Sequence, residues 1–135
     1  MKSIVLILAI LFVLNCAGCV FSDSNMLVVD ESHSMLQDFY VESDVVHIIC
    51  RITVINRSDE SISTTITGFS DEDVANGLLI NPELTGINLE NGTNTFSISA
   101  GETVEFLVDF QGVFFGNPQK YDRLIPDNIS FSIIP

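Results

Sequence analysis

The stretch Thr103-Val104-Glu105-Phe106-Leu107-Val108-Asp109-Phe110 decides the fold class of this chain. Every second residue in it is apolar: Val104, Phe106, Val108 and Phe110. The residues between them include Thr103, Glu105 and Asp109. A period of two predicts a β-strand that buries one face and exposes the other, so we expect these three polar residues to face solvent.

Neighbouring segments repeat the alternation. Phe96 and Ile98 alternate with serines before a turn at Ala100-Gly101, which predicts a hairpin over residues 93–110. Beyond Pro126, apolar residues again occupy every second position and predict a last strand: Ile129, Phe131 and Ile133.

Residues 45–56 are apolar on both faces, which predicts a strand at the centre of the sheet. Cys50 lies in this run, and we interpret it as a small buried hydrophobic residue rather than a nucleophile or a metal ligand. A polar turn at 57–60 then leads into residues 61–67, where one face carries Ile62, Thr64 and Ile66.

No segment keeps a helical period over the ten or so residues that a helix needs. About seven short strands without a repeat favour an all-β fold, an antiparallel β-sandwich over residues 26–135. The segments 52–59 and 96–106 resemble the hairpins of Ig-like domains in bacterial exported proteins, such as CARDB-type adhesion modules. The resemblance implies an Ig-like sandwich. The turn-rich segment 68–92 departs from that compact pattern, and both edge strands and a functional loop are compatible with it.

The N-terminus has the layout of a secretory signal. Lys2 precedes an apolar run at residues 4–14, which predicts a signal-peptide helix too short to span a bilayer comfortably. The following Leu14-Asn15-Cys16-Ala17-Gly18-Cys19 resembles the lipobox of bacterial lipoproteins, in which a cysteine after small residues is acylated and becomes the first residue. Cys19 fits that position better than Cys16, which follows the polar Asn15. An ordinary signal cut after Ala17 or Gly18, or an uncleaved anchor, is the alternative.

The lipobox implies a division into a lipoprotein signal peptide at 1–18, a lipidated tether at 19–25 and a domain at 26–135. It places the domain outside the cytoplasm in a bacterial cell envelope, held on a membrane by the lipid on Cys19. Cys50 is then left without a cysteine partner, so no intramolecular disulfide is expected.

The charge of the chain argues against nucleic acid as a partner. It has 5 Lys and Arg against 18 Asp and Glu in 135 residues, a formal net charge of −13. The cations are scattered, so no basic stripe is available to neutralise phosphates.

Three groups of residues are candidates for binding. Asp71, Glu72 and Asp73 offer carboxylates to calcium, although they lack EF-hand spacing and are also typical of a solvated turn. Lys120, Tyr121 and Arg123 are suited to a carboxylate ligand, unless Arg123 pairs with a neighbouring acid. Copper is a weaker hypothesis, since its soft donors have no regular spacing: His33, Met35 and His47.

The chain contains no sequence motif of a hydrolase nucleophile or a catalytic zinc site. We therefore expect no enzymatic activity and no cofactor. The predicted function is a non-catalytic accessory or protein-binding module with a protein partner in the envelope. The alternative is a lipoprotein that binds calcium or a small ligand through residues 68–92.

Overall fold

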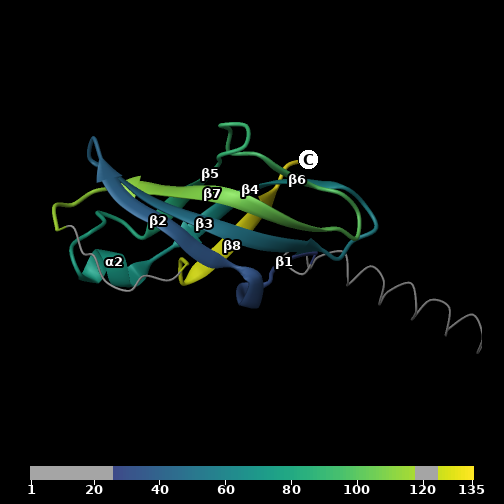
Figure 1. Cartoon of the computed structure of the whole chain (residues 1–135), viewed down its shortest axis with the longest axis horizontal. Helices are drawn as coiled ribbons and strands as arrows, with labels where there is room; N and C mark the ends of the chain where they lie inside the picture. Colours follow the sequence, from purple (N-terminus) through teal and green to yellow (C-terminus); the bar gives the residue numbers. More distant parts are fainter. Residues whose placement is uncertain (1–25, 118–124) are drawn as a thin grey trace, which may run out of the picture.

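The structure is a computed structural model that describes residues 26–117 and 125–135 (Figure 1). Cys19 and the predicted signal peptide, residues 1–18, lie outside these residues. The strands are β1 Leu27–Val29, β2 Met35–Glu42, β3 Val45–Asn56, β4 Ile62–Phe69, β5 Glu83–Asn88, β6 Phe96–Ile98, β7 Thr103–Val113 and β8 Asn128–Ile133. A 3-10 turn η2, Glu31–His33, and a short helix α2, Asp71–Ala75, complete the order.

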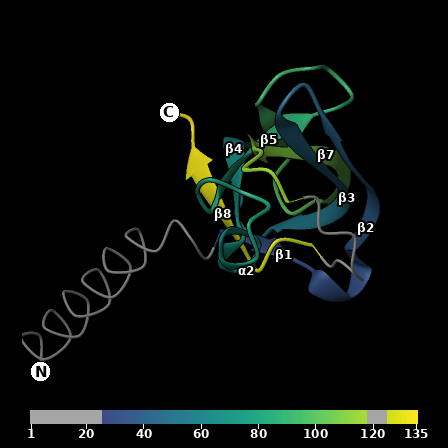
Figure 2. The same cartoon turned by 90° about the vertical axis from the view of Figure 1, so that its left-hand side faces the viewer.

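All eight strands of the described residues belong to one antiparallel sheet. Its order is β1-β3-β7-β5-β4-β6, with β2 also paired to β3 and β8 to β4. Figure 2 shows the sheet curling around a central core, so that its two ends approach each other. The predicted antiparallel all-β fold is confirmed.

β3 is the central strand, as its two apolar faces predict. It pairs with β7 from Val45↔Val113 to Ile55↔Thr103, and on its other side with both β1 and β2. Its inward residues are each at most 3% exposed: Val46, Ile48, Cys50, Ile52 and Val54. Burial of an apolar face of this length is the main stabilising contribution that one strand makes to such a domain.

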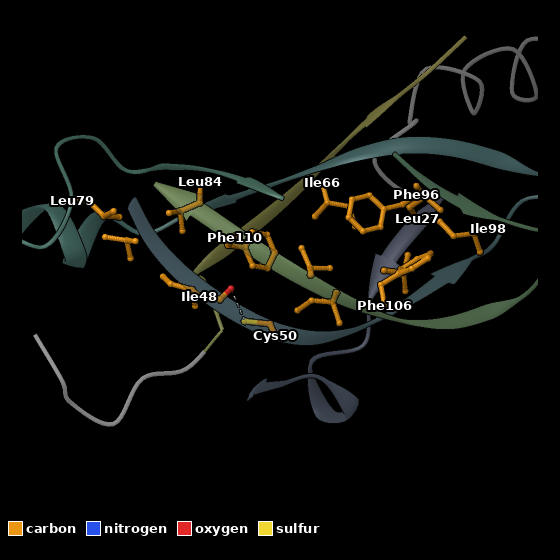
Figure 3. Packing of buried hydrophobic residues seen from close by; sticks show 14 of the residues in the cluster. Leu27, Ile48, Cys50, Ile66, Leu79, Leu84, Phe96, Ile98, Phe106 and Phe110 are labelled. Carbon is orange, nitrogen blue, oxygen red and sulfur yellow. Dashed lines mark hydrogen bonds between the residues drawn. The ribbon is translucent and has the colours of Figure 1, made fainter. Parts of the chain in front are cut away.

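The predicted hairpin over residues 93–110 is wrong. β6 pairs with β4, whereas β7 pairs with β3 and β5, so the two consecutive strands lie in different parts of the sheet. Phe96 and Phe106 explain this arrangement, because their rings meet edge to face across the core with centroids 5.1 Å apart (Figure 3). The turn at 100–101 therefore joins two strands that face each other rather than two strands that pair.

The segment 68–92 is more regular than its sequence indicates. β4 extends to Phe69, α2 follows, and β5 pairs with both β4 and β7. Gly86 is required in β5, because a Cβ atom there would collide with the backbone oxygen of Ile66 on the adjacent β4.

The inward face of β7 gives a test of the fold. Phe106 is 5% exposed, whereas Glu105 is exposed and pairs with the exposed Arg51. We expect Phe106→Ala to lower the free energy of unfolding by about 3 to 5 kcal/mol and Glu105→Ala to change it little. Urea denaturation midpoints measure the difference, and equal midpoints would contradict the assigned face.

Candidate functional site

The three predicted calcium ligands do not converge on a common point. Asp73 is buried, and the Ser70 hydroxyl donates a 2.6 Å hydrogen bond to its Oδ2. Asp71 and Glu72, on the same short helix, are exposed. No group of three His, Cys, Asp or Glu side chains in residues 26–117 and 125–135 is placed to hold a metal ion. The hydrogen bond from Ser70 therefore gives Asp73 a structural role within its own segment.

The other predicted site residues fall into two groups, those outside the described residues and those within them. Cys19, Lys120, Tyr121 and Arg123 lie outside the described residues, so their predicted roles stay predictions. His33 and His47 bind different carboxylates: the Nδ1 atom of each is 2.7 Å from an aspartate, Asp30 for His33 and Asp109 for His47. The proposed copper donors are therefore not brought together.

Asp109 corrects the prediction that the outer face of its strand is exposed. It is only 3% exposed although it lies on the outer face of the strand. Its Oδ2 accepts hydrogen bonds from His47 Nδ1 at 2.7 Å and from Gln111 Nε2 at 2.9 Å. Its Oδ1 is buried and has no hydrogen-bond partner within the described part of the chain. A buried carboxylate in this setting depends on its two donors.

Tyr40 completes this outer-face cluster. Its ring stacks on the His47 ring with centroids 4.5 Å apart. Desolvation raises the pKa of the Tyr40 hydroxyl, and the nearby carboxylates of Asp109, Glu42 and Asp38 raise it further. The cluster joins three strands, β2, β3 and β7, and its contacts are those of a structural polar network.

Cys50 is a core residue, as the sequence predicts. It is fully buried, and its Sγ lies 3.9 Å from the backbone oxygen of Ile48. Burial and, to a lesser extent, Asp109 raise the pKa of its thiol to about 12. A thiol that stays protonated at neutral pH is a poor nucleophile.

An exposed apolar patch lies at one end of the sheet, and we call it the apolar tip: Ile80, Val113 and Phe115. These side chains are 54%, 50% and 69% exposed. Their backbones are held together, because Ile80 N donates to Val113 O at 3.1 Å and Phe115 N donates to Leu78 O at 2.8 Å. The backbone that carries the patch is therefore held by hydrogen bonds between segments.

The second surface feature is a groove between the two ends of the sheet. It consists of two adjoining hollows of about 340 and 550 Å³ that share four residues: Glu31, Ile125, Pro126 and Asp127. β1 and β8 line one hollow, and the start of β2 lines the other. Pro126 is buried beneath the groove, where its ring lies 3.0 Å from the position of a Cβ atom on Gly68. Pro126, which lines both hollows, therefore lies close to Gly68 of β4.

The two His–Asp pairs allow a matched test of how burial changes the contribution of such a pair to stability. Both have the same Nδ1–Oδ2 distance, but the His47 and Asp109 side chains are 15% and 4% exposed, against 73% and 28% for His33 and Asp30. We expect His47→Ala to lower the free energy of unfolding by about 2 to 4 kcal/mol, because it leaves a buried carboxylate short of a donor. His33→Ala should have little effect, and His47→Gln, which keeps an N–H donor, should lose less than His47→Ala. Urea denaturation tests this, and equal effects of the two alanine variants would refute it.

The raised pKa of Cys50 predicts a pH dependence of stability. Above the ordinary pKa of a thiol, the unfolded chain releases the Cys50 proton while the folded chain keeps it up to about pH 12. Stability contributed by the protonated thiol is therefore full below about pH 9 and is lost as the pH rises through this window, by up to about 1.4 kcal/mol per pH unit. Unfolding free energies of the wild type and Cys50→Ala from pH 8 to 11 measure the effect. The wild type should lose more, and parallel curves would contradict the prediction.

Comparisons with protein-family models, with curated proteins and with solved structures find no match to this chain. Among the described residues, no helix is long and apolar enough to cross a membrane.

Proposed function

We propose that this protein is a bacterial envelope lipoprotein that acts as a non-catalytic protein-binding module. Residues 1–18 form the signal peptide, Cys19 carries the lipid, and residues 19–25 tether an Ig-like domain outside the cytoplasm. The lipobox resemblance supports the anchor. The resemblance to CARDB-type modules supports the binding role, and the antiparallel all-β fold is compatible with an Ig-like domain.

The position of the apolar tip carries the proposal. Met26, where the tether would join the domain, is next to the end of β3, since Arg57 N donates to Met26 O at 2.7 Å. The tip lies at the other end, because Val113 pairs with Val45 at the start of β3. In Figure 1, β1 is at the right, whereas the end of β7 is at the left. The eleven steps of an extended strand separate these ends by about 36 Å.

An anchor at one end and an exposed apolar surface at the other suit a module that meets its partner away from the membrane. A large apolar side chain that remains 69% exposed, as Phe115 does, is stabilised when a partner covers it. Aromatic residues of this kind often dominate the binding energy of protein interfaces. The partner that fits is an envelope protein with an apolar surface.

The anchor is tested by metabolic labelling. Cys19→Ser should abolish incorporation of labelled palmitate in bacterial cells and release the protein from the membrane fraction, because a thiol is required for acylation. Cys16→Ser should keep the label and serves as the matched control. Palmitate incorporation into Cys19→Ser would overturn the assignment.

The tip is tested by partner recovery. Phe115→Ser should lower recovery of a crosslinked envelope protein by at least about tenfold without changing the urea midpoint, since the side chain is exposed. Leu89→Ser is the control, because Leu89 is 40% exposed outside the tip. Equal recovery from both variants would exclude the tip as the binding surface.

A further inference from the structure

The groove between β1 and β8 is bordered by two strand edges that no described strand pairs. β1 pairs only with β3, and β8 pairs only with β4. Because every step of the order β1-β3-β7-β5-β4 and the step from β4 to β8 is antiparallel, β1 and β8 also run in opposite directions. The sheet thus leaves open the one ladder that would close it into a barrel.

The peptide groups of both edges point into this opening. On β1, Asp30 N donates to Thr53 O, and Met26 O accepts from Arg57 N. Hydrogen bonds in an antiparallel ladder alternate along the strand, so the N–H and C=O groups of Leu27 and Val29 point away from β3. Leu27 and Val29 are two of the residues that line the groove.

β8 shows the same arrangement. Ile134 N donates to Ser63 O, and in this register Ser132 and Ser130 also direct their peptide groups toward β4. The peptide groups of Ile129 and Phe131 therefore point to the free edge. Both residues line the groove with half-buried apolar side chains. An extended segment that enters the groove would find hydrogen-bonding groups and an apolar surface on the same residues.

The rim of the groove is acidic. Glu31 and Asp127 line both hollows, both are exposed, and no Lys or Arg is among the described residues that line the groove. A second copy of the chain, with its formal charge of −13, would bring like charges together at this rim. A positively charged segment would meet opposite charges there, so charge complementarity selects a basic partner.

We infer that the groove binds an extended segment of a partner protein, with apolar residues at alternate positions and a Lys or Arg at the end that lies beside Glu31 and Asp127. The segment adds a strand to the sheet at the free edge of β8, its apolar side chains enter the hollows, and its cation meets Glu31 and Asp127. The site is separate from the apolar tip, and it does not depend on acylation of Cys19.

The chain has no Trp, which permits a direct binding test with a Trp-containing probe. The probe is the peptide Lys-Val-Thr-Trp-Thr-Val-Lys with blocked ends, titrated with the full chain in uncharged detergent micelles. Its fluorescence should shift to shorter wavelength as the Trp enters the apolar groove. The matched peptide with Glu in place of both Lys should bind at least tenfold more weakly.

Charge-reversal variants locate the site. Glu31→Lys/Asp127→Lys should lower the affinity for the basic probe at least tenfold and raise the affinity for the acidic one, because it reverses the charge of the rim. Glu90→Lys/Glu102→Lys changes the net charge equally at exposed residues outside the groove and should change the affinity for the basic probe less than threefold. Both pairs are exposed, so folding should be retained, and circular dichroism checks it.

Amide hydrogen exchange tests strand addition itself. The basic probe should increase protection of the Ile129 and Phe131 amides, while the Ser130 amide, which already faces β4, should change little. Absence of binding at millimolar probe, equal binding of both peptides, equal effects of the two variant pairs, or unchanged exchange at Ile129 and Phe131 would each overturn the inference. Dimerisation through this edge, detected by light scattering, would also overturn it.

Discussion

Burial of the inward face of β3 is the constraint on which the rest of this structure depends. The face is continuous from Val46 to Val54. The strand is paired with β7 from Val45 to Ile55, and on its other side with β2 as far as Arg51 and with β1 from Val54. The only described cysteine, Cys50, is free and part of this face, so packing replaces covalent cross-linking. Because β3 runs from one end of the sheet to the other, it also sets the separation between the apolar tip and Met26.

The sequence predicts which residues form strands better than it predicts which strands pair. Alternation reports that one face is apolar, and Phe96, Ile98 and Phe106 are buried as the alternation indicates. It does not report where the neighbouring strand comes from, and proximity in sequence wrongly favoured a pairing of β6 with β7. Asp109 illustrates a second limit, because its carboxylate is buried on the outer face and its donor His47 lies on another strand, β3. A pattern within one strand contains no information about such a partner.

The proposed binding surfaces, like the strand pairing, depend on contacts between segments that are distant in the sequence. The predicted lipobox is a local motif of the sequence, whereas each proposed surface is assembled from distant segments. The tip requires Ile80 beside Val113, and the groove requires Leu27 near Ile129. One local signal did exist at the tip, since Val113-Phe114-Phe115 continues an alternating strand with consecutive apolar residues. Such a run is also typical of a buried strand, so its exposure depends on the end of the sheet to which β7 brings it.

The open edge of the sheet offers a structural explanation for the strong acidity of the chain. β8 is a six-residue edge strand without a charged residue, proline or bulge, and unprotected edges of this kind favour pairing between copies. In this molecule the protection is supplied by charge around the edge rather than on it: Asp127 directly precedes β8, and Glu31 faces it across the groove. Repulsion between two such acidic molecules opposes self-pairing over roughly a Debye length of 8 to 10 Å. The same field would attract the basic segment that we propose, so one set of charges would both oppose self-pairing and favour that partner.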